Sequence, residues 1–132
     1  MTIFIDTSAI LAILDADDQN YKKAKKKWEE LISKEATLVC SNYVLIETVA
    51  LVQNRLGMKA VRSFQEDVVP MLTIEWVDEI IHQDGVTSVL AANRRELSLV
   101  DCVNFDFMRQ LGIKTVFAFD KHFKERGFEC IP

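Results

Sequence analysis

The chain has 132 residues, of which 49% are hydrophobic and 27% are charged, and its formal net charge is −4. This length suits one domain with a real hydrophobic core, and no apolar run approaches the ~20 residues that a membrane span needs. The acidic balance excludes nucleic-acid binding through bulk positive charge, so any such binding must be local.

Cysteine usage indicates a reducing compartment. Cys40, Cys102 and Cys130 are odd in number, widely spaced and in no C-x-x-C pair, which argues against a disulfide framework and against a zinc site. Met1 and Thr2 lead straight into an apolar run, without a basic leader and a cleavage site. We therefore expect a cytoplasmic protein that makes no membrane contact.

The chain opens with the pattern of a strand, a turn and a helix. The β-branched and aromatic run 2–5 is too short for a helix and predicts a buried strand. Asp6, Thr7 and Ser8 follow it and are residue types that begin helices. Asp6 thus lies at the carboxyl end of a strand, where ligands and catalytic groups collect in open α/β sheets. An Asp here also caps a helix, and at this point that simpler role is an equal alternative.

A polar turn at 15–20 leads into a lysine-rich helix. Apolar residues within 21–32 recur at spacings of three, four and seven, which predicts one buried stripe along that helix. Lysines cover its other faces. Such a run usually forms a solvated face, and the alternative is that Lys22, Lys23 and Lys26 contact RNA backbone.

The rest of the chain continues the alternation of strands and helices. We expect further strands at 37–40, 73–77 and 115–119, a closing edge strand at 128–132, and helices at 41–57, 58–72, 78–95, 98–112 and 121–127. Gly85 weakens the helix 78–95 in its middle. Glu47 lies near the start of the helix 41–57, where the helix dipole alone already favours an acid.

Four acids are predicted to meet at one edge of the fold. Alternating strands and helices indicate a parallel sheet with helices on both faces, and right-handed crossovers bring all carboxyl ends of the strands to one side. Asp6 and Asp120 each follow a strand there. Glu47 and Asp101 lie in the first turns of helices that begin on that side, and Ser98 precedes Asp101 at capping-box spacing.

Acids gathered in this way repel one another and lose solvation unless a cation compensates. Oxygen ligands without a thiolate pair or a histidine cluster favour Mg²⁺ or Mn²⁺ over zinc. Metal sites of this kind hydrolyse phosphodiesters. The sequence therefore predicts a metal-dependent nuclease.

Four motifs occur along the chain in a specific combination: Ile5–Ala9, Glu47 in the middle helix, Leu97–Cys102 and Phe117–Phe123. Together they resemble the PIN domain family, and more narrowly the VapC-type toxin ribonucleases of type II toxin–antitoxin pairs. The resemblance covers essentially the whole chain. It implies one PIN-like nuclease domain over residues 1–132, with three α/β/α layers and a central parallel sheet of four to five strands.

The resemblance also implies an activity, a cofactor and partners. The activity is Mg²⁺- or Mn²⁺-dependent endoribonuclease cleavage, and the partners are an RNA substrate and a cognate antitoxin. In addition, apolar surfaces on the middle helices predict that the protein forms a homodimer. The roles of catalytic residue and metal ligand fall on the same four acids, here called the acidic quartet: Asp6, Glu47, Asp101 and Asp120.

Other positions match the family pattern less directly. Thr7 and Ser8 fit the polar position after the first acid, and Ser98 fits the hydroxyl position before the third. Where the family often has Ala after the third acid this chain has Cys102, which we interpret as a small packing residue.

The two histidines are interpreted as structural. His82 lies on a helix with no partner nearby in sequence and is expected at the surface. His122 follows the last acid of the quartet by two residues and could approach a substrate phosphate, but the proposed chemistry does not require it.

Two alternatives stay open at this point. The first is a PIN-fold ribonuclease that acts in RNA processing outside toxin pairs, and the short chain favours the toxin over it. The second is a receiver-like signalling module, which needs paired acids after the first strand and a phosphoacceptor Asp after the third. Only Asp6 follows the first strand here, and Asp78 follows the third, so this alternative is the weaker one.

Overall fold

Five short apolar runs form one parallel sheet with the strand order β3-β2-β1-β4-β5. The computed structural model describes all 132 residues. The strands are β1 (Thr2–Ile5), β2 (Thr37–Ser41), β3 (Leu72–Glu75), β4 (Thr115–Phe117) and β5 (Glu129–Ile131). β1 is central and pairs with β2 on one side and β4 on the other. The prediction of a parallel sheet that ends in an edge strand at the end of the chain is confirmed.

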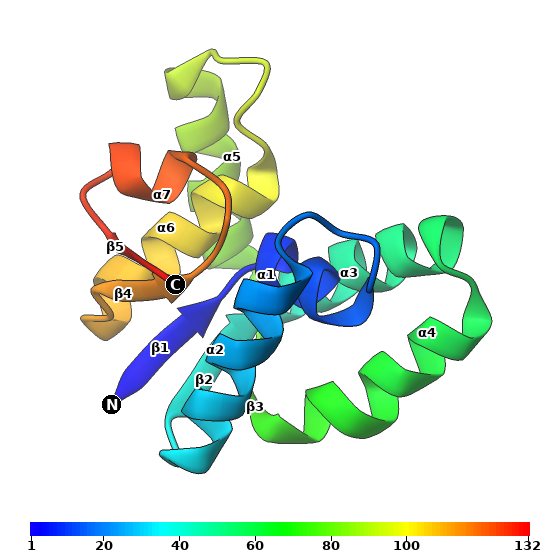
Figure 1. Cartoon of the computed structure of the whole chain (residues 1–132). Helices are drawn as coiled ribbons and strands as arrows, with labels where there is room; N and C mark the ends of the chain where they lie inside the picture. Colours follow the sequence, from blue (N-terminus) through cyan, green and yellow to red (C-terminus); the bar gives the residue numbers. More distant parts are fainter.

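Helices cover both faces of the sheet (Figure 1). They are α1 (Thr7–Leu14), α2 (Tyr21–Ser33), α3 (Asn42–Arg55), α4 (Met58–Ser63), α5 (Glu79–Ala92), α6 (Leu99–Leu111) and α7 (His122–Glu125). α1 to α4 lie on one side of the sheet, and α5 to α7 lie on the other. This follows from right-handed crossovers, because β2 and β3 are added on one side of β1 whereas β4 and β5 are added on the other. The predicted three-layer α/β/α architecture is confirmed.

The reversal of strand order creates a crevice between the ends of β1 and β4. Connections leave these two neighbouring strands toward opposite faces of the sheet, so the chain splays apart at their carboxyl ends. Asp6 comes directly after β1, and Asp120 comes three residues after β4. The topology thus brings together two acids that are far apart in sequence.

Buried phenylalanines hold the α6 and α7 layer on the sheet. Phe105 of α6 and Phe123 of α7 pack edge to face, with ring centroids 5.2 Å apart. Both are buried, as are Phe4 and Phe117 on the neighbouring strands β1 and β4. Burial of such large side chains contributes roughly 1.5–3 kcal/mol each. This packing joins α6, whose first turn carries Asp101, to α7, which begins two residues after Asp120.

The sequence predicted that Gly85 weakens the helix 78–95, but the structure shows no break at this residue. α5 runs without interruption from Glu79 to Ala92, and Gly85 lies buried against α6. A Cβ atom at this position would lie 2.7 Å from Cγ2 of Val103 and 3.1 Å from Cδ1 of Leu99. The glycine therefore allows two helices to approach closely, a packing need that a pattern within one helix does not reveal.

Some predicted boundaries are wrong by a few residues. The predicted helix 58–72 is a short α4, a π-helical turn at Phe64–Val68 and a 3-10 turn at Val69–Met71, because Pro70 has no N–H to continue an α-helix. The strand predicted at 115–119 ends at Phe117. Beyond it, the Phe119 N–H donates to Oγ of Ser8 instead of a neighbouring strand. None of the helices is both long and apolar enough to traverse a bilayer.

Candidate active site

The acidic quartet lines one open cavity of about 230 Å³ at the carboxyl edge of the sheet. Of the site residues predicted from the sequence, the structure brings together the quartet and the three polar residues Thr7, Ser8 and Ser98. Leu11 and Leu51 complete the lining. Four different segments contribute acids: the start of α1, the second turn of α3, the start of α6 and the loop after β4.

Asp6 is the most deeply buried acid of the cavity, with 4% of its surface exposed. It is the N-cap of α1, and its Oδ2 accepts hydrogen bonds from the backbone N–H of Ser8 (3.1 Å) and from Oγ of Ser8 (2.7 Å). Its Oδ1 lies 3.4 Å from Nδ2 of Asn104. The capping role considered as an alternative is therefore real, and it coexists with a position in the cavity.

Burial raises the pKa of Asp6 from 3.8 to about 7. Loss of solvation is the largest cause, and the negative charges of Asp101 and Glu47 raise the pKa further. The hydrogen bonds from Ser8 act in the opposite direction. The structure thus holds a carboxyl group where its charge is disfavoured and where a nearby cation would stabilise it.

Asp101 and Ser98 form the capping box that their spacing predicted. Oγ of Ser98 accepts from the backbone N–H of Asp101 (3.1 Å), and Oδ2 of Asp101 accepts from the backbone N–H of Ser98 (3.0 Å). Asp is thus long enough for the reciprocal bond that Glu or Gln usually makes. The box holds one carboxylate oxygen of Asp101 and leaves the other without a hydrogen bond inside the protein.

The pKa values of Glu47 and Asp101 are both raised by their position in this cavity. Desolvation is the largest cause that raises the pKa of each, and each also experiences the charge of Asp120. The Thr7 hydroxyl partly offsets the effect on Glu47. His122 partly offsets the effect on Asp101. The mutual repulsion that the sequence predicted among the acids is therefore present in the folded chain.

Backbone geometry holds Asp120 at the edge of the cavity. Its Oδ1 accepts from the backbone N–H of His122 (2.9 Å), and Nε2 of the buried His122 ring lies 3.8 Å from the same oxygen. Nδ1 of His122 is 3.5 Å from Oε2 of Glu125. His122 thus packs between two acids, and its interpretation as a structural residue stays a prediction.

The donor set of the cavity suits Mg²⁺ or Mn²⁺. It offers carboxylate and hydroxyl oxygens and no thiol or imidazole in its lining. No three acidic, histidine or cysteine side chains converge tightly enough to enclose an ion by themselves. An open arrangement of this kind fits Mg²⁺, which typically takes one or two carboxylates and keeps several waters.

A family model described as PIN domain matches residues 3–129 of the chain. The chain belongs to the PIN domain family. The receiver-like alternative is therefore wrong.

Similar proteins that are named as VapC nucleases support the narrower resemblance. The chain is 33% identical to the 23S rRNA-specific endonuclease VapC20 of Mycobacterium tuberculosis, over 96% of this chain and 95% of that protein. It is 25% identical to a VapC ribonuclease of Aquifex aeolicus, over 96% of this chain and 93% of that protein. The resemblance to the VapC-type proteins inferred from four motifs is confirmed.

Solved structures agree on the fold. The crystal structure of M. tuberculosis VapC20, described as a sarcin-ricin loop cleaving toxin, superposes with a TM-score of 0.86 at 32% identity, covering 98% of this chain and 99% of that one. FitAcB from Neisseria gonorrhoeae superposes with a TM-score of 0.68 at 18% identity, covering 100% and 97% of the two chains, and supports the fold alone.

The lysines singled out in the sequence lie outside the acidic cavity of this PIN domain. Lys23 and Lys26 line a separate groove of about 290 Å³ together with Lys27, Glu30 and Pro132. We call it the lysine groove. Lys22 is exposed but does not line it. Pro132 follows β5, which is parallel to β4, so it places one end of the groove at the edge of the sheet that carries the acids, whereas the other four residues lie along α2.

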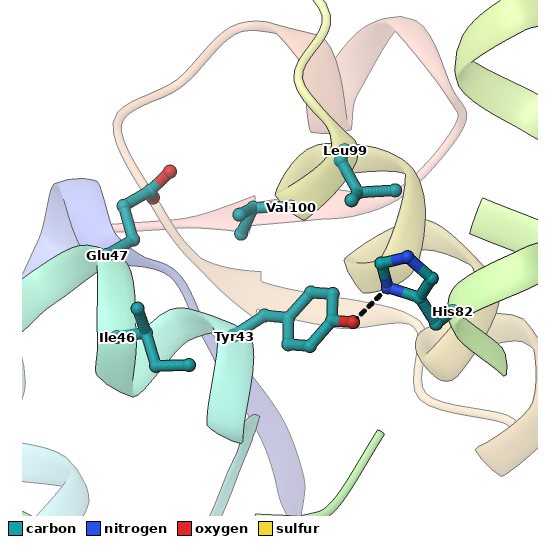
Figure 2. Close-up of a pocket in the computed structure, with 6 residues that line it drawn as sticks. All are labelled: Tyr43, Ile46, Glu47, His82, Leu99 and Val100. Atoms are coloured by element: carbon teal, nitrogen blue, oxygen red, sulfur yellow. Dashed lines mark hydrogen bonds between the residues drawn. The ribbon is translucent and has the colours of Figure 1, made fainter. Parts of the chain in front are cut away.

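The expected surface position of His82 is wrong, because its side chain is half-buried and has a partner distant in sequence. Nδ1 of the half-buried His82 on α5 forms a hydrogen bond with Oη of Tyr43 on α3 (Figure 2). The two residues line an apolar cavity of about 340 Å³, and Glu47 belongs to the lining of both this cavity and the acidic one. A contact across 39 positions leaves no local signal in sequence.

Sequence reasoning also missed Asn104. It lies on α6 one turn after Asp101, fully buried, and contacts Asp6. A polar residue on the apolar face of a predicted helix, three positions from a candidate ligand, was the available signal. That signal is weak, because a single polar residue on an otherwise apolar helix face does not by itself indicate a function.

The raised pKa of Asp6 predicts how the stability of the metal-free PIN domain depends on pH. The folded state holds the proton up to about pH 7, whereas the unfolded chain releases it near pH 3.8. The free energy of unfolding measured in EDTA should therefore fall as the pH rises from about 4 to about 7, by a few kcal/mol at about 1.4 kcal/mol per pKa unit. Denaturant titrations at several pH values measure it.

Asp6→Asn should flatten this profile, and Asp67→Asn, at an exposed acid outside the cavity, should leave it unchanged. Equal slopes for wild type and Asp6→Asn would contradict the environment described for Asp6.

Proposed function

We propose that this protein is a Mg²⁺- or Mn²⁺-dependent endoribonuclease that hydrolyses RNA phosphodiester bonds as the toxin of a type II toxin–antitoxin pair. The observation that carries the proposal is the convergence of four acids on one cavity, where burial and mutual repulsion raise the pKa of Asp6 to about 7. The names of the VapC relatives support the activity. In this proposal residues 1–132 act as one nuclease domain in the cytoplasm.

Each residue of the cavity has a distinct part in the proposed reaction. Asp6, Glu47, Asp101 and Asp120 hold the cation and are its candidate ligands. When bound, the cation supplies positive charge to the phosphodiester and lowers the pKa of an attacking water. Ser8 fixes one oxygen of Asp6, and Ser98 fixes one oxygen of Asp101. The Thr7 hydroxyl accepts a hydrogen bond from Oγ1 of Thr48 (3.4 Å) and lowers the pKa of Glu47, which stabilises its charged form.

Ribosomal RNA is the first substrate to test. The M. tuberculosis relative is named as specific for 23S rRNA, and its crystal structure is described as that of a toxin that cleaves the sarcin-ricin loop. These relatives favour the toxin over an RNA-processing role outside toxin pairs.

We expect the purified protein to cut RNA containing the sarcin-ricin loop when Mg²⁺ or Mn²⁺ is present and to stop when EDTA is added. Asp6→Asn and Asp101→Asn should each lower the rate by at least 100-fold, since an electrostatic group in a nuclease site is worth a few kcal/mol. Asp106→Asn is the matched control, because Asp106 lies on the same helix as Asp101 but pairs with Arg109 outside the cavity. Gel analysis of end-labelled RNA measures the cleavage.

Undiminished cleavage in EDTA would refute the metal mechanism. In cells, expression of the wild type should arrest growth, and Asp6→Asn should not. Arrest by Asp6→Asn would assign the toxicity to something other than the quartet. Relief of arrest by co-expression of the cognate antitoxin would support the toxin role, and the gene adjacent to that of the protein is the first candidate for it.

We also propose that the lysine groove contacts the RNA backbone. Lys23 and Lys26 contribute positive charge along α2, in a groove with one end at the edge of the sheet that carries the acids, and Lys22 adds charge next to them. Lys27 is partly neutralised by Glu30 at 3.3 Å. Local positive charge beside an acidic, cation-binding cavity compensates for the net charge of −4.

Replacement of Lys22, Lys23 and Lys26 by Gln should weaken RNA binding and flatten its salt dependence, because each lost phosphate contact lowers the slope of log K against log salt by about 0.7 for single strands. The control removes the same charge elsewhere, at the exposed residues Arg55, Lys59 and Lys114. Fluorescence anisotropy at several salt concentrations measures both quantities. Identical slopes for the two triple variants would contradict an RNA contact and leave the lysine groove as an ordinary solvated surface.

A homodimer through α3 and α5 is the third part of the proposal. Large apolar side chains are exposed on these helices and on the segment before α5: Ile46 (65%), Trp76 (70%) and Ile80 (68%). The Val77 N–H donates to Oδ1 of Asn42 (2.7 Å), which joins the segment before α5 to the start of α3. The cavity between Tyr43 and His82 continues this apolar surface (Figure 2). A second copy of the chain is the proposed occupant, since exposed apolar surface marks an interface and most homo-oligomers pair about a two-fold axis.

Ile46→Lys combined with Ile80→Lys should convert a dimer into a monomer, because two charges would be buried without partners. Leu111→Lys is the control, at an exposed apolar residue at the far end of α6. Light scattering coupled to gel filtration measures the mass. A monomeric wild type, or a double variant that stays dimeric, would contradict this assignment of the surface.

A further inference from the structure

We infer that Asn104 is a positioning residue of the candidate active site, whose side-chain amide orients the carboxylate of Asp6 toward the proposed cation. The inference rests on the proposed function and adds to it a residue outside the acidic quartet. It arises from one contact and one unsatisfied atom in the core.

The contact joins α6 to the start of α1. Asn104 is 0% exposed, and its Nδ2 lies 3.4 Å from Oδ1 of Asp6. Its neighbours along the helix, Val103 and Phe105, belong to the hydrophobic core. Asp6 is thus the only hydrogen-bonding partner of this amide within the protein.

The unsatisfied atom is the amide oxygen of the same side chain. Oδ1 of Asn104 is buried without a hydrogen-bond partner, the only such side-chain atom in the chain. A buried acceptor that is left unpaired destabilises the folded state, and an apolar side chain of similar shape would avoid that cost. The amide group therefore costs stability at this position, and the contact with Asp6 is the one function that the surrounding structure offers for it.

Asp6 is held from two sides by different donors. Ser8 binds Oδ2 through its backbone N–H and its hydroxyl, and that hydroxyl is itself fixed because it accepts from the Phe119 N–H (2.9 Å). Oδ1 has a single donor, which is Asn104. Loss of the Asn104 amide would thus leave Oδ1 without a donor, and the Ser8 bonds to Oδ2 alone would restrain rotation about the Cβ–Cγ bond. Partners that orient a metal ligand from behind typically change metal affinity by 10–100-fold.

An amide suits this role better than a charged donor. Lys or Arg beside Asp6 would neutralise the carboxylate and compete with the cation for it. The amide N–H is directed at Asp6 without any net charge, so the full negative charge of the cavity remains for the ion. When Asp6 is ionised, as it would be beside a cation, the opposite orientation of the amide would place two acceptor oxygens against each other, which favours Nδ2 on the Asp6 side.

The test is the affinity of the whole protein for Mn²⁺, measured by titration calorimetry or by the EPR signal of free Mn²⁺. Asn104→Leu keeps the approximate volume and removes the donor. We expect its Mn²⁺ affinity to fall by 10–100-fold, whereas its melting temperature in EDTA stays equal or rises. Met108→Leu, at a fully buried position one turn further along α6, is the matched control and should bind Mn²⁺ like wild type. Equal affinities for wild type and Asn104→Leu would overturn the inference.

A double-mutant cycle separates positioning from a general structural effect. In an Asp6→Asn background, Asn104→Leu should not weaken the residual Mn²⁺ binding further, because the carboxylate that it orients is gone. A further loss of the same size as in wild type would overturn the inference. Asn104→Ala gives the same comparison if Leu does not pack. A wild type that binds no Mn²⁺ at all would overturn the proposed function together with this inference, whereas equal affinities refute the inference alone.

Discussion

The electrostatics of the acidic cavity impose the strongest constraint on this fold. Asp6 is buried at the end of a central strand with the charges of Asp101 and Glu47 nearby, and its pKa is raised to about 7. A fold built only for stability would place an apolar or hydrogen-bonded neutral group there. The apolar core has to outweigh this local cost, and a bound cation would turn the same repulsion into binding energy.

Helix caps solve part of the problem of holding such acids. Asp6 caps α1, and Asp101 completes the capping box of α6. Each cap engages one carboxylate oxygen with backbone N–H groups, which orients the side chain and partly compensates for lost solvation. The second oxygen of Asp101 has no hydrogen bond within the protein, and that of Asp6 has one, from Asn104. Capping and the proposed ligand role are therefore complementary uses of one side chain, although they look like competing explanations in the sequence.

The remaining surfaces are arranged around this edge of the sheet. Pro132 places one end of the lysine groove at the same edge, and the apolar cavity between α3, α5 and α6 shares Glu47 with the acidic cavity. In the proposed function, RNA reaches the acids between a basic surface and a protein–protein interface. Such an arrangement confines the polyanion to one face of a protein whose net charge is negative.

The fold class and the members of the acidic quartet could be predicted from the amino-acid sequence. Short β-branched runs alternating with amphipathic helices leave few topologies other than a parallel sheet with helices on both faces. Acids after β1 and near the starts of α3 and α6 then have to meet, because all these points lie at one edge. The capping box of Ser98 and Asp101 could also be predicted from the sequence, since its hydrogen bonds join residues only three positions apart.

The contacts that join distant segments could be found only in the folded chain. The pairing of Tyr43 with His82, the close approach at Gly85 and the contact of Asn104 with Asp6 each depend on how two helices, or a helix and a strand end, lie in space. The early end of β4 has the same origin, because Ser8 captures the Phe119 N–H. Local patterns encode the period and the caps of each element, whereas these features depend on distances between elements that no single stretch of sequence contains.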